Sequence, residues 1–264
     1  SAHTQVIMGT PDLHSAAIGS GAVNDYAAHL YIGTSSWLAC HVPFKKTDLF
    51  HNMAALPSAL PNRYLLINEQ ESAGGCLTFF QDNLLYPADE LATTVQPDDL
   101  YTRFEQMISR IPPGSGNLIF TPWLNGERSP IDDSNMRGGF HNVSLHTTRA
   151  HLLRSIYEGV AYNSRWLLGC VEKFVGRRLD VIRLIGGGAR SAAWCQIYAD
   201  VLDRPIAQVQ DPVQANARGA GLLAALALGY LRTDEMADCV PVAHTYAPNS
   251  QTRATYDHLF AEFV

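Results

Sequence analysis

The segment Val181-Ile-Arg-Leu-Ile-Gly-Gly-Gly-Ala-Arg-Ser191 decides the fold class of this chain. Its apolar, β-branched first half predicts a buried strand over residues 181–185, and the glycines predict a tight turn after it. The apolar spacing after Ser191 predicts a helix to Leu202, and residues 205–209 again have the composition of a buried strand. A strand, a helix and a second strand in this order form a βαβ unit, which pairs parallel strands. We therefore expect an α/β fold.

An early hairpin makes the expected sheet mixed rather than wholly parallel. Residues 28–33 and 37–42 both predict strands, and the short polar run Gly33-Thr34-Ser35-Ser36 between them is typical of a hairpin. Further elements alternate along the chain, so we expect a mixed sheet flanked by helices. The further strands are predicted at residues 5–9, 63–68 and 117–120, and the further helices at 76–85, 98–110, 148–175, 215–228 and 252–264.

The bulk composition bounds the class of protein. The chain has 264 residues, of which 47% are hydrophobic and 17% charged, as in a globular protein with a sizeable core. Its formal charge of −6 provides no basic footprint for nucleic acid or an anionic membrane. The most apolar stretch, residues 219–231, is shorter than the roughly 18 residues of a membrane span. Five cysteines without a C-x-x-C motif favour a reducing compartment, so we expect a cytoplasmic protein.

Gly33, Thr34 and Ser35 at the expected hairpin tip are the first candidate binding residues. A glycine and two hydroxyl side chains at such a tip offer several N–H and O–H donors in a small concavity, which suits a phosphate group. The same residue types are common in ordinary hairpin turns. The motif by itself leaves both interpretations open.

The glycine turn at residues 186–191 is the second candidate. Glycines between a strand and a helix let a ligand approach the backbone, and the helix N-terminus favours anions. The spacing Gly186-x-Gly188-x-x-Ser191, with Asp211 further on, also resembles a loose dinucleotide fingerprint. A tight strand-to-helix turn without a ligand explains the same residues.

Asp12 is the candidate carboxylate. It follows the strand expected at residues 5–9, where a side chain at the carboxyl end of a strand is well placed to reach a ligand. It is also a preferred N-cap residue for a helix that begins at Leu13, and the two roles are compatible. His141, His146 and His151 do not have the spacing of a metal cluster, so no metal site formed by protein ligands is expected.

Several segments together resemble one family, the FGGY carbohydrate kinases. The clearest begins Arg137-Gly-Gly-Phe-His-Asn-Val-Ser and continues into a helix that reaches Glu158, although Asn142 stands where the family signature has glycine. The order of all the segments agrees with the family from about residue 5 to the C-terminus. The other matching segments are Pro122–Pro130, which contains Glu127-Arg128, then residues 186–202 and residues 217–225.

This resemblance implies an actin/Hsp70-like (ribonuclease H-like) domain. Family members pair a sugar-binding first domain with an ATP-binding second domain, and residues 1–264 resemble the second domain alone. We therefore expect the N-terminal sugar-binding domain to be absent from this chain, which starts at Ser1 almost directly before a predicted strand. The implied activity is ATP-dependent phosphorylation of a sugar or polyol, and the xylulokinase subgroup suggests D-xylulose or a related ketose. The chain alone is expected to be inactive.

The resemblance also implies roles for individual residues. Asp12 matches the catalytic base, although Thr10-Pro11 before it departs from the usual glycines. ATP and Mg²⁺ are the implied cofactors, and a homodimer is compatible with the sequence. The implied nucleotide-binding residues are Gly33, Thr34, Ser35, Gly74 and Gly75 for the phosphates and Gly187, Gly188, Ala189 and Ser191 for the adenine side.

Two other functions remain open at this point. A non-catalytic relative that kept the nucleotide-binding fold would have the same turns. An NAD-dependent oxidoreductase would explain residues 186–211, but it leaves the tip at residues 33–35 and the Glu127-Arg128 loop without a role.

Overall fold

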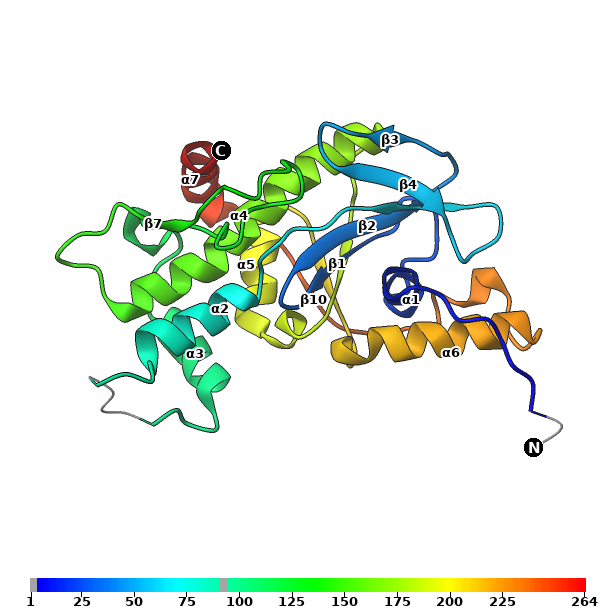
Figure 1. Ribbon diagram of the computed structural model, residues 1–264, viewed down its shortest axis with the longest axis horizontal. Helices are drawn as coiled ribbons and strands as arrows, with labels where there is room; N and C mark the ends of the chain where they lie inside the picture. The colour runs from blue at the N-terminus through cyan, green and yellow to red at the C-terminus, as the bar shows by residue number, and fades with distance from the viewer. Residues whose placement is uncertain (1–3, 91–94) are drawn as a thin grey trace.

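The computed structural model describes residues 4–90 and 95–264. Its centre is one eight-stranded sheet with the strand order β10-β9-β8-β1-β2-β5-β4-β3 (Figure 1). The β1–β8 and β8–β9 pairs are parallel and the other pairs are antiparallel, which confirms the mixed sheet. The strands are β1 (Ala28–Ile32), β2 (Ser36–Val42), β3 (Thr47–Asp48), β4 (Met53–Pro57), β5 (Tyr64–Ile67), β8 (Ile182–Ile185), β9 (Ile206–Val209) and β10 (Val242–Tyr246).

Helices cover both faces of this sheet (Figure 1). One face carries α1 (Asp12–Gly19) and α6 (Ala215–Ala227), and the other carries the remaining helices. Beside them lies a two-stranded sheet of β6 (Ile119–Thr121) and β7 (Gly139–His141). The remaining helices are α2 (Gly75–Phe80), which continues as a π-helical turn over residues 81–85, α3 (Leu100–Ile108), α4 (Arg149–Val175), α5 (Ala192–Leu202) and α7 (Arg253–Phe263).

Side chains of β1 and β2 alternate between the two faces, as strands with a period of two residues require. Leu30 and Ile32 join the large core under α4 and α5. Tyr31 and Trp37 face α1 and α6, where their rings stack with centroids 3.9 Å apart. Both faces of the central hairpin are therefore packed against helices.

Helix α1 is held in place by α6 along its second half. A Cβ atom at Gly19 would lie 1.7 Å from the carbonyl oxygen of Ala215, and one at Gly219 would lie 1.8 Å from that of Ser15. Only glycine permits two backbones to approach so closely. This crossing fixes α1 on the sheet and, with it, the position of Asp12 at its first turn.

Residues 5–9 do not form the predicted strand. They run as an exposed segment outside the sheet, with Val6 90% and Met8 89% exposed (Figure 1). A strand is stabilised by pairing with a neighbour, and the sheet order leaves no place for this segment. The prediction of a strand rested on the apolar composition of these residues, and composition does not indicate whether a neighbouring strand is available for pairing.

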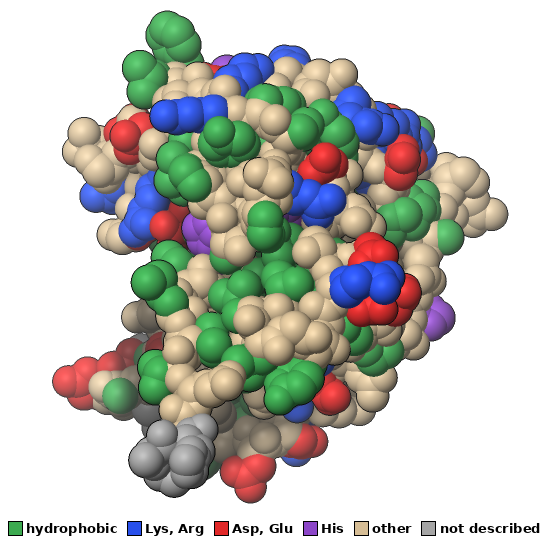
Figure 2. All heavy atoms as spheres, turned by 90° about the vertical axis from the view of Figure 1, so that its right-hand side faces the viewer, with side chains coloured by type: hydrophobic (Ala, Val, Ile, Leu, Met, Phe, Trp, Pro, Cys, Tyr) green, Lys and Arg blue, Asp and Glu red, His purple; other side chains and the backbone are tan. Residues whose placement is uncertain are grey.

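The side of the molecule with α1 and α6 is shown in space-filling form in Figure 2. Hydrophobic side chains gather in the middle of this face, and charged side chains lie around them (Figure 2). Across the described ranges, no helix combines the length and apolar character that a membrane crossing requires.

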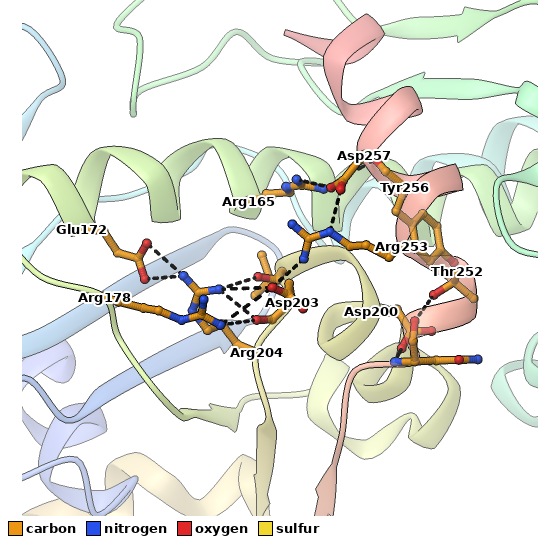
Figure 3. A network of polar contacts seen from close by, with 12 residues as sticks. Arg165, Glu172, Arg178, Asp200, Asp203, Arg204, Thr252, Arg253, Tyr256 and Asp257 are labelled. Carbon is orange, nitrogen blue, oxygen red and sulfur yellow. Dashed lines mark hydrogen bonds and ion pairs between the residues drawn. The ribbon is translucent and has the colours of Figure 1, made fainter.

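Buried and half-buried ion pairs tie α4, α5 and α7 together (Figure 3). Asp257 on α7 accepts hydrogen bonds from Arg165, at 2.5 Å, and from Arg253, at 2.6 Å. Arg204, which follows α5, holds both carboxylate oxygens of Glu172 on α4. These ion pairs add to the apolar packing of α4, α5 and α7 in the large core.

Candidate functional site

Two glycine turns meet at one edge of the sheet. Because β1 and β8 are parallel neighbours, their carboxyl ends lie side by side, and Gly33 and Gly186 follow directly. A cavity of about 760 Å³ lies at this edge, within the range of small-molecule sites. It is lined by Tyr31, Ile32, Gly33, Thr34, Gly74, Leu77, Thr78, Asp98, Asp99, Tyr101, Thr102, Glu105, Tyr157, Gly187, Gly188, Arg190, Ser191, Trp194 and Val213.

The hairpin tip forms one part of the cavity wall. The N–H groups of Ala73 and Gly74 donate to the carbonyl oxygens of Thr34 and Gly33, each at 2.8 Å. A Cβ atom at Gly74 would lie 2.5 Å from the Gly33 oxygen, so this contact requires glycine. In the part of the chain that the structure describes, the N–H groups of Thr34 and Ser35 donate to no other residue. They are available donors for an anionic ligand.

The turn at residues 187–191 forms a second part of the wall. A Cβ atom at Gly187 would meet nothing within 4 Å, so the backbone there is open to a ligand. Ser191 caps α5 by accepting the N–H of Trp194 at 3.1 Å, and its hydroxyl donates to Glu105 at 2.6 Å. Ala189 is buried beneath the turn, and its carbonyl oxygen accepts a 2.6 Å hydrogen bond from Gln208.

Helix α3 and the residues before it form a third wall that sequence analysis missed. Asp98, Asp99, Tyr101 and Glu105 line the cavity from this side. From the sequence, Asp98 was interpreted only as the start of a helix. No local sequence pattern indicates which face of α3 lies toward the glycine turns. The contact between Glu105 and Ser191 joins residues far apart in the chain, so it depends on the tertiary structure.

The cavity brings most of the predicted binding residues together: Gly33, Thr34, Gly74, Gly187, Gly188 and Ser191 line it. Ser35, Gly75 and Ala189 are neighbours of these residues but do not line the cavity. The hydroxyl of Ser35 donates to Glu69 at 3.2 Å, and a Cβ atom at Gly75 would lie 3.2 Å from the side chain of Thr34.

Asp12 lies outside the cavity lining. It is the first residue of α1, with Pro11 in the N-cap position, and its exposed carboxylate accepts the N–H of Leu13 at 2.7 Å. Leu13 packs against the hydrophobic cluster that also contacts Tyr31, a residue of the cavity wall. Leu13 and Tyr31 therefore pack against the same cluster, while the side chain of Asp12 is exposed.

The fold is an α/β domain of the actin/Hsp70-like class, in which a mixed sheet carries the site at the carboxyl ends of its parallel strands. The chain belongs to the FGGY family of carbohydrate kinases, whose C-terminal domain description matches residues 28–228. Both the fold class and the family expected from the sequence are confirmed.

Known relatives agree with this assignment. The chain is 27% identical to a xylulose kinase of Staphylococcus epidermidis, over 100% of this chain and 51% of the relative. It is 26% identical to a gluconokinase of Bacillus subtilis, over 99% of this chain and 50% of the relative. A crystal structure of a ligand-bound xylulose kinase from Lactobacillus acidophilus superposes with a TM-score of 0.86 at 28% identity, covering 100% of this chain and 51% of that one. The chain thus spans about half the length of these relatives.

Proposed function

We propose that this chain is the nucleotide-binding half of a kinase that transfers phosphate from ATP to a hydroxyl group of a sugar or polyol. One observation carries the proposal: the two glycine turns follow neighbouring parallel strands and line a single cavity at one edge of the sheet. Adenine would lie against residues 187–191, and the triphosphate would extend toward residues 33–35 and 74–75.

The shape and donors of the cavity support this orientation. The available N–H groups of Thr34 and Ser35 suit phosphate oxygens. The bare backbone at Gly187 and the aromatic side chains Tyr157 and Trp194 suit a flat base. Arg190 adds a cationic side chain to the same wall. Mg²⁺ bridging the phosphate oxygens would neutralise their charge.

Asp12 is proposed as the catalytic base. Its exposed carboxylate at the start of α1 could accept the proton of the attacking hydroxyl group from a substrate bound outside the cavity. Phosphoryl transfer has a loose transition state in most descriptions, so catalysis depends mainly on positioning and charge stabilisation. A weakly basic carboxylate is sufficient when the proton leaves late.

The sugar would be bound largely by a domain that this sequence does not include. The relatives are about twice as long as the matched region, and the names xylulose kinase and gluconokinase describe those proteins. We propose a ketose such as D-xylulose as the substrate of the complete enzyme. Without the second wall that orients the hydroxyl group and excludes water, this chain should phosphorylate sugars little or not at all.

A thermal-shift comparison of MgATP with NAD tests the nucleotide site on this chain. A ligand that binds only the folded state stabilises it by about 2.7 kcal/mol at a concentration of 100 Kd. We expect MgATP to raise the melting temperature and NAD to have no effect. The βαβ unit around residues 186–211 is present, but Asp211 does not line the cavity. Stabilisation by NAD alone would refute the kinase assignment.

Activity of the complete enzyme on a panel of ketoses and polyols, measured with MgATP, tests the reaction and the substrate. We expect one ketose to be phosphorylated with the highest kcat/KM. Nucleotide binding without activity on any member of the panel would instead favour a non-catalytic relative.

A further inference from the structure

Glu127 lies in the loop between β6 and β7, outside the cavity, and the residue is 3% exposed. One carboxylate oxygen accepts the N–H of Glu71 at 2.7 Å and that of Arg128 at 2.9 Å. The other accepts the side-chain N–H of Asn163 on α4 at 2.5 Å. Burial raises the pKa of this carboxyl group, and the donated hydrogen bonds act in the opposite direction. A buried carboxylate thus fixes the backbone at Glu71 to α4.

Arg128 holds the same segment from the solvent side. Its guanidinium donates to Glu69 at 2.5 Å and also contacts the carboxylate of Glu71. Glu71 receives a further 2.8 Å hydrogen bond from Asn125 in the same loop. The planar guanidinium presents several donors in a fixed geometry, so it can hold two carboxylates at once. Arg128 therefore holds Glu69 and Glu71, the residues before and after Gln70, and together with Glu127 it forms a clamp on residues 69–71.

These clamped residues in turn hold the hairpin tip. The carboxylate of Glu69 accepts a hydrogen bond from the hydroxyl group of Ser35 at 3.2 Å. The backbone of Gln70 pairs in both directions with Ser36, at 2.7 and 3.2 Å. Further along the same segment, Ala73 and Gly74 donate to the carbonyl groups of the tip. A continuous set of contacts therefore leads from the β6–β7 loop to the tip.

We propose that Glu127 and Arg128 are positioning residues for the phosphate end of the site. They hold residues 69–75 against the hairpin tip and so orient the N–H groups of Thr34 and Ser35. The inference rests on the proposed nucleotide function, because it assumes that phosphates lie at that tip. It assigns a role to Glu127 and Arg128, which lie in a segment that resembles the family but do not line the cavity.

The two glycine turns should respond differently when the clamp, formed by Glu127 and Arg128 on residues 69–71, is broken. The turn at residues 187–191 rests on Gln208 and Glu105 and makes none of the contacts described for the clamp. Loss of the clamp should weaken ligands that carry phosphates and spare a ligand that has only the base and the ribose. A general loss of stability would weaken all of them.

Affinities of this chain for MgATP, MgADP and adenosine, measured by ligand-observed NMR, test the proposal. In Arg128→Met we expect MgATP and MgADP affinity to fall about tenfold and adenosine affinity to stay unchanged, because small misplacements of binding groups have large effects. Arg128→Lys, which cannot hold both glutamates, should recover part of the loss. Arg232→Met is the matched control: it removes an exposed arginine paired with Asp234 and Glu235 and should change no affinity.

Glu69→Gln is the second variant, which weakens the contact between the clamp and the tip but leaves the buried Glu127 intact. It should reproduce the selective loss of phosphate ligands even if Arg128→Met folds poorly. Unchanged MgATP affinity in both folded variants, or an equal loss for adenosine, would overturn the positioning role. Failure of the unaltered chain to bind MgATP would overturn the nucleotide site itself and the inference with it.

Discussion

The edge of the sheet that carries the cavity and the face formed by α4, α5 and α7 are built by different means. At the cavity, glycines and backbone hydrogen bonds bring chain segments together, and donors remain available. On the helical face, charged side chains are paired with one another, as for Arg154 and Glu158 at 2.8 Å. A site that must receive an anion keeps donors unpaired, whereas a packed interface satisfies every charge it buries.

Asp12→Asn removes the one side chain to which we assign proton transfer, a role that backbone groups cannot take. Of all the substitutions, it should have the largest effect on turnover. We expect turnover of the complete enzyme to fall about 10²–10⁴-fold, the usual contribution of a general base. MgATP affinity of this chain should stay the same, because Asp12 does not line the cavity. Asp180→Asn, at another exposed aspartate, is the control and should leave turnover unchanged. Near-normal turnover of Asp12→Asn would remove it from this role.

Arg154→Met removes the cation of the buried Arg154–Glu158 ion pair on the helical face. Glu158 would remain buried with hydrogen bonds from Gly114, Ser115 and Tyr256 but without its cation. Removing one partner of a buried ion pair costs about 3–5 kcal/mol. Urea unfolding should show this loss, and Arg253→Met, in a half-exposed pair, should cost at most about 1 kcal/mol. Equal losses in the two variants would contradict the distinction between buried and exposed pairs.

Acidification probes two buried histidines in the central hairpin. Burial lowers the pKa of His29 from 6.5 to about 3 and that of His41 to about 4. Their folded-state pKa values lie below the unfolded value, so their contribution is complete above pH 6.5 and is lost as the pH falls. Between pH 7 and pH 5 each should reduce the free energy of unfolding by about 2 kcal/mol.

Urea unfolding at the two pH values measures this effect. His41→Gln is less stable at pH 7, since His41 bonds to Ala22 and Ser58. The variant should nevertheless lose less stability on acidification than the unaltered chain. The same pH dependence in both proteins would show that His41 does not titrate as a buried neutral group.

Two glycine-to-alanine changes probe the site that backbone contacts build. In Gly74→Ala the new Cβ would meet the Gly33 oxygen at 2.5 Å, so we expect a loss of about 1–3 kcal/mol and weaker MgATP binding. In Gly187→Ala the Cβ meets no atom of the chain. Thermal unfolding should be nearly unchanged, and only MgATP affinity should fall if the ligand approaches this backbone. Unaltered affinity in Gly187→Ala would contradict the proposed position of the base.

Local pattern predicted the elements that neighbouring residues determine. The strand at residues 182–185 and the starts of α5 and α4 were all anticipated within a residue or two. Each depends on periodicity, glycine or a hydroxyl side chain within one turn of chain. Strands β4 and β10 were missed. β10 pairs with β9, which lies far back in the chain, whereas β4 pairs with the next strand, β5, but has no alternation of polar and apolar residues.

The sequence by itself determined the α/β class, the family and the two glycine turns, since these are short motifs whose residues act on their own backbone. Only the tertiary structure placed Gly33 beside Gly186, turned α3 toward them and connected Glu127 to the hairpin tip. The strand expected at residues 5–9 does not form, because this segment pairs with no strand of the sheet. Contacts between distant segments depend on which strands pair and which helices cross, and no local pattern encodes that choice.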